Sequence, residues 1–390
     1  MHTSRLRRNL SVGAIVLFSA GSLAACGSDS EDTASTTAPA AAATGAGVLA
    51  DVCPSTIVFQ ADWEPETEHG GIYQLIGEDY EIDTDAKSVS GPLLSGGEDT
   101  GVAVEIRIGG APIGYQSAQS VLYQDRDVLL GYGRATEYMV TQEDTPVKAV
   151  LASMETSPYA IYWDPETYPD VETIADLKDE GATISIGPES SVWVDYLLGT
   201  GQVEESQLDR GDQNKPANFV AAGGELAEAG FITAEPFMYE MEIAEWGKPV
   251  IGELLADAGY PEYFQAVVAR DEDIEAQADC FEALVPIMQQ AQVDFMADPQ
   301  NTDELIVELV EAYDTGWVYT MDSAKFAYEA GIERGVLANG ADGVMGSFDL
   351  DRVQELIDIV TEYSDADVSE ITPDALVTNE FLDTSISAES

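Results

Sequence analysis

One short stretch of the chain, ADWEPETEHGG (residues 61–71), places a histidine beside a tryptophan, three glutamates and two glycines. The only other histidine is His2, at the extreme N-terminus. His69 therefore lacks a second histidine for a metal site, and its own segment offers no nucleophile that it could activate. We expect His69 either to hydrogen-bond a ligand or to tie the loop that opens a helix. We predict no catalytic residue, no metal and no cofactor.

The first 25 residues indicate the compartment. A short basic segment precedes an apolar run, SVGAIVLFSAG, which is too short to span a membrane, and the segment ends in LAAC at Cys26. This order predicts a secretory signal peptide. Its ending resembles a bacterial lipobox, in which Cys26 would be acylated and become the first mature residue; the alternative is a plain signal peptide with a chance cysteine. Residues 26–52 are rich in Ser, Thr, Ala, Pro and Gly, which predicts a flexible tether.

Length and charge limit what the remaining chain can be. The 390-residue chain leaves about 340 residues after the tether, more than one hydrophobic core normally holds, so we expect two lobes. A formal net charge of −57 argues against nucleic acid as a partner and is compatible with a saline habitat. Cys53 and Cys280 are the cysteines outside Cys26. In an oxidising compartment their even number favours one disulfide over two buried thiols.

The hydrophobic pattern alternates between strands and helices. Apolar, β-rich runs occur at 56–62, 101–110, 127–133 and 183–187, and helical faces at 305–310 and 353–360. A helix start is also expected at 188–191, and another at Pro236. This alternation predicts an α/β fold with mostly parallel sheets, in which small ligands bind beyond the carboxyl ends of the strands.

Four predicted strand ends carry side chains that suit a ligand cleft. They are rich in aromatic, carboxylate and hydroxyl groups and poor in basic ones, which suits a flat heterocycle with nitrogen donors better than sulfate or nitrate. The candidate ligand-binding residues are Trp63, His69, Gly70, Tyr132, Ser190, Trp193, Glu235 and Tyr239. The alternatives are core packing for the rings and a solvated position for Glu235. We expect packing for Trp317 and turn chemistry for Asp342.

Longer segments resemble a known family. VFQADWEPETEHGGIYQLIG, VEIRIGGAPIGYQSAQSVLYQDRDVLLGYG and FVAAGGELAEAGFITAEPFMYEMEIAEWGKPV are similar to the solute-binding proteins of bacterial ATP-binding cassette (ABC) importers for sulfonates, nitrate and thiamine pyrimidine precursors. The resemblance covers nearly all of residues 55–365. It implies a two-lobe type II periplasmic-binding-protein fold, with lobe 1 at 53–158 and 267–390 and lobe 2 at 159–266. It also implies two crossings, near 157–163 and 264–270.

The resemblance also implies a function. The Trp-x-Pro element and its histidine are similar to those of the pyrimidine-precursor binders, so we expect an extracytoplasmic lipoprotein that captures a small nitrogen heterocycle. It would be a monomer, anchored to the cell membrane through Cys26, and would deliver its solute to importer membrane subunits. Riboflavin, a sulfonate or nitrate are the alternative solutes. Related pyrimidine synthases depend on a cysteine-rich cluster that this chain lacks, so an enzyme is the weaker interpretation, and a structural protein with a degenerate cleft is a further one.

Overall fold

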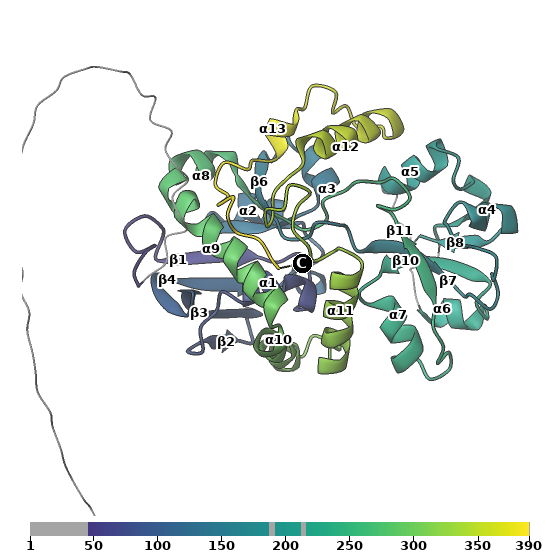
Figure 1. Cartoon of the computed structure of the whole chain (residues 1–390), viewed down its shortest axis with the longest axis horizontal. Helices are drawn as coiled ribbons and strands as arrows, with labels where there is room; N and C mark the ends of the chain where they lie inside the picture. The colour runs from purple at the N-terminus through teal and green to yellow at the C-terminus, as the bar shows by residue number, and fades with distance from the viewer. Residues whose placement is uncertain (1–45, 187–191, 212–215, 390) are drawn as a thin grey trace, which may run out of the picture. The chain divides into compact units, whose positions relative to one another are not determined.

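Two β-sheets organise the chain in a computed structural model, which describes residues 46–186, 192–211 and 216–389. The first sheet has seven strands in the order β2-β3-β4-β1-β5-β12-β6, and the second has five in the order β11-β7-β10-β8-β9. We call the part around the seven-stranded sheet the first lobe and the part around the five-stranded sheet the second lobe (Figure 1). The two sheets are flanked by helices, as an α/β fold requires.

The first sheet has seven strands, and burial differs among them. The sheet consists of β1 (Thr56–Gln60), β2 (Glu81–Asp83), β3 (Ser88–Ser95), β4 (Glu98–Arg107), β5 (Val128–Gly133), β6 (Val147–Ala152) and β12 (Ala266–Arg270). Strands β5 and β12 are buried along their whole length. A strand covered on both faces has no solvent side, so its sequence is a continuous apolar run without polar alternation.

The second sheet is reached by two connections. It consists of β7 (Tyr159–Trp163), β8 (Thr183–Ser185), β9 (Leu208–Asp209), β10 (Leu226–Phe231) and β11 (Ile251–Leu254). The chain enters it between β6 and β7 and returns to the first sheet between β11 and β12. The lobe bounds at residues 158 and 266 stay predictions.

The sheets are mixed, and the prediction of mostly parallel strands was wrong. Among the described residues, four of the ten strand pairs are parallel: β1 with β4, β1 with β5, β10 with β8, and β8 with β9. A hairpin that turns through Gly96 and Gly97, at φ 58° and 80°, makes β3 antiparallel to β4. Two glycines at positive φ suit such a tight turn. The returning strand β12 is antiparallel to both its neighbours.

The helices vary widely in length. They are α1 (Gly70–Tyr73), α2 (Ala118–Gln124), α3 (Ala135–Val140), α4 (Asp176–Glu180), α5 (Val192–Gly199), α6 (Pro216–Ala221), α7 (Glu235–Phe237), α8 (Asp271–Ala276), α9 (Ala278–Ala297), α10 (Gln300–Tyr313), α11 (Met321–Glu333), α12 (Leu350–Tyr363) and α13 (Pro373–Leu376). The predicted apolar faces at 305–310 and 353–360 are buried in α10 and α12, which confirms both. The predicted helix start at 188–191 lies outside the described residues. None of the described helices has the length and apolarity of a membrane span.

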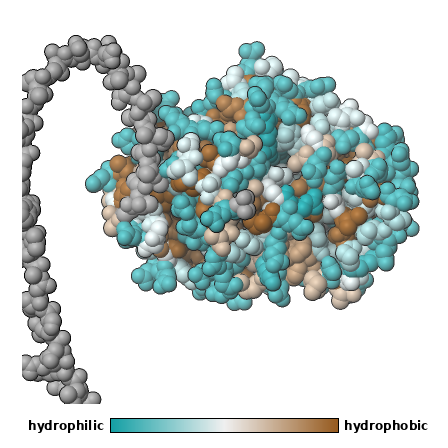
Figure 2. Space-filling view, in the orientation of Figure 1, coloured by the Kyte–Doolittle hydropathy of each residue, from teal (hydrophilic) through white to brown (hydrophobic). Residues whose placement is uncertain are grey.

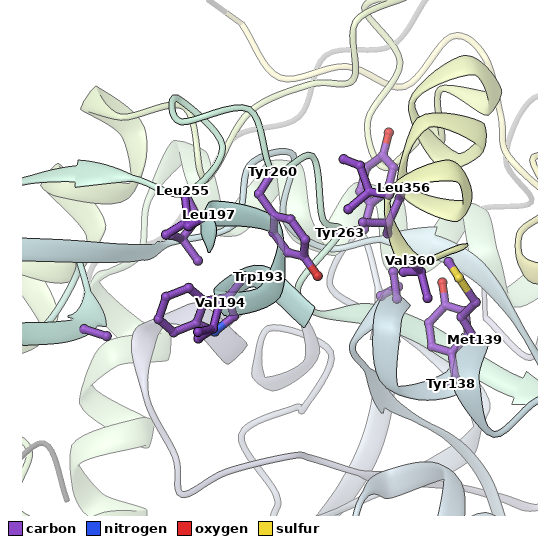
Figure 3. Close-up of a cluster of buried hydrophobic side chains, with 14 of the residues drawn as sticks. Tyr138, Met139, Trp193, Val194, Leu197, Leu255, Tyr260, Tyr263, Leu356 and Val360 are labelled. Atoms are coloured by element: carbon purple, nitrogen blue, oxygen red, sulfur yellow. The ribbon is translucent and has the colours of Figure 1, made fainter. Parts of the chain in front are cut away.

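One buried cluster joins the two lobes. Trp193 and Leu197 of α5, in the second lobe, belong to the same hydrophobic cluster as Leu356 and Val360 of α12. Tyr260 lies between them on the connection that leads from β11 back to β12 (Figure 3). The outer surface in view is mostly hydrophilic, with scattered apolar patches (Figure 2). The connection between the lobes is therefore a packed core and not a loose linker.

A disulfide fastens the start of the first lobe. Cys53, just before β1, is bonded to Cys280 near the start of α9, with their Cα atoms 4.8 Å apart. The predicted pairing is confirmed. Cys280 is fully buried in the hydrophobic cluster of the first lobe, and Cys53 packs against that cluster. The bond therefore links two segments that are 227 residues apart in the chain.

Candidate ligand site

His69 lies at the centre of a buried polar group in the first lobe. Its side chain is fully buried, and its Nε2 lies 2.9 Å from Asp62 Oδ1. Its ring stacks on Tyr132, with ring centroids 5.3 Å apart and an interplanar angle of 19°. Tyr132 is the last residue but one of β5 and is itself 1% exposed, packed edge-on against Phe59. Both sequence candidates, His69 and Tyr132, are thus brought together, and Tyr132 holds the imidazole in place.

Gln265 completes this group from the returning chain. It stands one residue before β12, and its Nε2 lies 3.3 Å from Asp62 Oδ2 and 3.1 Å from His69 Nε2. Gln265 Oε1 and His69 Nδ1 are buried and have no hydrogen-bond partner among the described residues. In a neutral imidazole whose Nε2–H donates to Asp62, the Nδ1 atom can only accept a hydrogen bond. The Oε1 atom of Gln265 is an acceptor as well. Buried acceptors without partners are rare in folded proteins, so these two point to a donor from outside the chain.

Carboxylates surround the same group. Burial, followed by repulsion from Glu68, Asp62, Glu235 and other acids, raises the pKa of Glu66 well above its usual value. Burial also raises the pKa of Glu68, which lies within reach of Thr233 in the second lobe. Burial raises the pKa of Glu235 to about 7, although the N–H of Phe231, 2.7 Å away, donates to this carboxylate and opposes the shift.

Aromatic rings border the acids on one side. The Trp63 ring lies 5.9 Å from Tyr115 and 6.2 Å from Trp317, measured between ring centroids. Trp317 in turn stacks on Tyr319 at 6.4 Å, and the Tyr319 hydroxyl accepts a hydrogen bond from the backbone N–H of Thr67. Tyr115 is 70% exposed. Rings from three separate segments of the first lobe therefore form one partly open aromatic surface.

Three sequence candidates have other surroundings, and a fourth cannot be placed. Trp193 is buried against Tyr159, with ring centroids 5.5 Å apart, and Tyr239 is fully buried in the second lobe, where its hydroxyl donates to Glu228. A Cβ on Gly70 would lie 2.3 Å from the Phe295 ring, so this glycine allows α1 to approach α9. Ser190 lies outside the described residues.

Several residues of the site were not among the sequence candidates: Asp62, Glu66, Glu68, Tyr115, Gln265 and Trp317. The three acids stand in the stretch that drew attention to His69, but an acid is usually solvated in a chain with 73 of them. Trp317 was expected to pack, and it does so against Trp63. Gln265 carries no sequence signal, because its role depends on a contact 196 residues away. Asp342 accepts from the N–H of Val344, as its expected turn role requires.

Two surface cavities of the first lobe do not contain this site. One, of about 440 Å³, is lined by Tyr73, Leu94 and residues of α9 and α10. The other, of about 420 Å³, is lined by residues from β1, β4 and β12 together with Arg126. In the described ranges, no three His, Cys, Asp or Glu side chains are arranged so that they could hold a metal ion.

Comparison with solved structures establishes the fold. No protein-family model and no curated protein matches the sequence. The ligand-binding component of an ABC-type import system from Staphylococcus aureus, solved with zinc bound, superposes with a TM-score of 0.52 at 12% identity, covering 86% of this chain and 100% of that one. A structure described as the periplasmic sulfonate-binding protein SsuA from Methylobacillus flagellatus gives 0.52 at 13%, covering 84% and 93%. The chain has the two-lobe fold of periplasmic binding proteins.

Proposed function

We propose that this protein is the extracytoplasmic solute-binding component of an ABC importer, and that it captures a small planar nitrogen heterocycle such as a thiamine pyrimidine precursor. The solute would bind where the strands of the two lobes end, closure would bury it, and the closed protein would dock on the importer's membrane subunits. No bond would be broken. A signal peptide and an acylated Cys26 would hold the protein at the outer side of the cell membrane.

The observation that carries this proposal is the chemistry of the site. Aromatic surfaces at Trp63 and Trp317 border the carboxylates of Glu66 and Glu68, and Gln265 contributes a vacant acceptor oxygen. A flat ring with amino groups offers a face for stacking and N–H donors for the oxygens. Small-molecule sites typically combine such apolar walls with a few polar groups that fix orientation.

The other solutes fit this site less well. A sulfonate or nitrate carries negative charge, and the acids at Glu66, Glu68 and Glu235 would repel it. Riboflavin offers a flat ring as well, so it remains the second candidate within the same fold. An enzyme would need a nucleophile beside a base, and the contacts of His69 are with Asp62, Gln265 and Tyr132.

A thermal-shift screen of the purified full chain tests the proposal. Amino-pyrimidines, riboflavin, alkanesulfonates, nitrate and amino acids would each be added at the same concentrations. A ligand at about 100 times its Kd stabilises the folded protein by about 2.7 kcal/mol, so a true solute gives a rise in Tm that grows with concentration. We expect that rise with an amino-pyrimidine. A rise with sulfonate or nitrate alone would contradict the proposed solute, and no rise with any of them would contradict the receptor function.

A further inference from the structure

Carboxylates of the two lobes oppose each other at the site. Glu66 and Glu68 belong to the segment after β1, and Glu235 opens α7 in the second lobe. Glu235 is among the charges that act on Glu66, and Glu68 is among those that act on Glu235. The lobes also meet nearby, where the Phe237 ring of α7 lies 5.6 Å from the Phe326 ring of α11. Closure of the lobes therefore brings like charges together.

These acids lack a cationic partner of their own. Within the described ranges, neither Glu66, Glu68 nor Glu235 forms an ion pair with a lysine or arginine. The Nε2 of His69 lies 4.0 Å from Glu66 Oε1, but it lies closer to Asp62 Oδ1, at 2.9 Å. Like charges held close together without a counter-charge destabilise the state that contains them.

Two described basic side chains near the site, Arg134 and Lys87, contact groups other than Glu66, Glu68 and Glu235. Arg134, the N-cap residue of α3 directly after β5, lies 3.4 Å from Glu262, and its guanidinium lies over the Phe264 ring. Lys87 acts on Glu64, but its ammonium group donates to the carbonyl of Tyr313. Among the described residues, neither of these basic groups is therefore paired with Glu66, Glu68 or Glu235.

A buried amide oxygen next to these acids points the same way. Gln265 is 3% exposed, and its Nε2 lies 3.3 Å from Asp62 Oδ2 and 3.1 Å from His69 Nε2. Its Oε1 has no partner among the described residues. An amide oxygen can only accept, and so can ionised carboxylates. A molecule that satisfies all of them must bring several N–H or O–H donors.

The aromatic rings add a preference for positive charge. Trp63 stands between Asp62 and Glu64 in the chain, and its ring contacts Trp317. Tyr319 is partly buried, and Glu68 and Glu66 both act on its hydroxyl. The face of an aromatic ring attracts a cation, most strongly in tryptophan. A site made of aromatic rings and carboxylates suits an ammonium or amidinium group better than a bare metal ion. A metal ion would require oxygen ligands that converge on one point.

We propose that the solute is bound as an organic cation, an amine or a protonated amino-heterocycle, whose positive charge lies between Glu66 and Glu68 of the first lobe and Glu235 of the second and thereby holds the lobes closed. This inference rests on the proposed function, because it concerns the same site. According to this inference, the lobes close only around a positively charged solute. A neutral solute of the same shape would leave the repulsion between the opposed carboxylates in place.

A matched pair of ligands tests this inference. An aminomethyl-pyrimidine is cationic at neutral pH, whereas the hydroxymethyl-pyrimidine with the same ring is neutral. Titration calorimetry on the full chain would measure both, together with Zn²⁺ as a metal probe. We expect the cationic ligand to bind at least ~10-fold more tightly, and Glu66→Gln and Glu235→Gln each to weaken it ~10-fold while changing the neutral ligand less than about 3-fold.

The control is Glu81→Gln, which removes one negative charge from the exposed strand β2 and should leave both affinities unchanged. Thermal melts of each variant confirm that it is folded. Equal affinity of the two pyrimidines, or equal losses in Glu66→Gln and Glu81→Gln, would overturn the inference while leaving the receptor function standing. Zn²⁺ binding that disappears in Glu66→Gln and Glu235→Gln, without binding of the amine, would overturn it in favour of a metal. Absence of binding by either pyrimidine would instead count against the proposed solute.

Discussion

At the scale of single residues, His69 and Trp63 have different surroundings, which suit different roles. His69 is fully buried between Asp62 and Tyr132, so it is a positioning residue for the polar group around it. Trp63 is only partly buried and borders the exposed Tyr115 ring. The residue in the stretch 61–71 that can offer a face to a flat solute is therefore the tryptophan.

Replacing Trp63 should affect binding more than folding. Trp63→Ala removes a stacking surface, which should weaken binding of the best amino-pyrimidine by about one to two decades, with a change of at most about 1 kcal/mol in the free energy of unfolding. Trp63→Phe keeps a ring and should retain most of the affinity. Calorimetric titration and urea unfolding of both variants would measure this. If Trp63→Ala binds as the parent does, the ring belongs to the scaffold.

At the scale of elements, short helices bring the polar groups to the strand ends. Helix α1 has four residues, and its two glycines lie against α9. A Cβ on Gly71 would meet the flexible end of Gln292, but a Cβ on Gly70 would meet the ring of Phe295 at 2.3 Å. The two glycines therefore let α1 pack closely against α9. His69, the N-cap residue of α1, lies in the buried polar group.

Gly70→Ala should therefore destabilise the first lobe. The added methyl group must displace either the Phe295 ring or the helix, which typically costs about 1 to 3 kcal/mol in a packed core. Gly211→Ala is the control, because a Cβ there would lie 3.4 Å from Asp209 Oδ1, an ordinary contact. Urea unfolding would compare the two. Equal stability of both variants would show that α1 can shift without cost, and that Gly70 is free to serve the ligand.

At the scale of the whole molecule, acidity governs stability. The chain carries a formal net charge of −57, and part of that charge is buried at the junction of the lobes. Burial is the largest cause of the raised pKa at Glu66, Glu68 and Glu235. Neighbouring acids raise the pKa further, whereas hydrogen bonds oppose the shift at Glu68 and Glu235. The titratable groups around them are Asp62, Glu64, Glu228, His69, Asp303, Tyr73 and Tyr319.

Stability should fall as pH rises. The pKa of Glu235 is about 7 in the folded chain against 4.5 in its ordinary state, so between these values the folded protein binds more protons than the unfolded one. The stabilisation is fully present below about pH 4.5 and is lost as pH rises through about 7, a difference on the order of 3 kcal/mol for this group. Urea unfolding between about pH 5 and about pH 8 would measure it.

Glu235→Gln should flatten this pH dependence, and Glu81→Gln should not, because Glu81 is exposed and lies in another part of the first lobe. Affinity for a cationic solute should change in the opposite direction and rise with pH over the same range, since ionised carboxylates bind it best. Identical slopes for the two variants would mean that the pH effect comes from the general surface charge and not from the site.

The sequence by itself determined the local features. Apolar runs predicted the strands around 56–62 and 127–133, and periodicity predicted the buried faces of α10 and α12, because both patterns depend on neighbours within a few residues. The even pair of cysteines favoured a disulfide. Strand direction was predicted wrongly, since the alternation of elements carries no information about a hairpin at Gly96 or a strand that returns from the second lobe.

Only the tertiary structure decided what surrounds the site. Gln265 meets Asp62 across 203 residues of chain, and Glu235 acts on Glu66 from the other lobe. Such contacts depend on how two lobes pack, and nothing in the residues near Gln265 distinguishes it from a solvated glutamine. The same holds for Trp193 and Tyr239, whose aromatic character suits a ligand wall and a core equally well until burial assigns them to the core. Residue type decides what a side chain can do, and packing decides which of those roles it has.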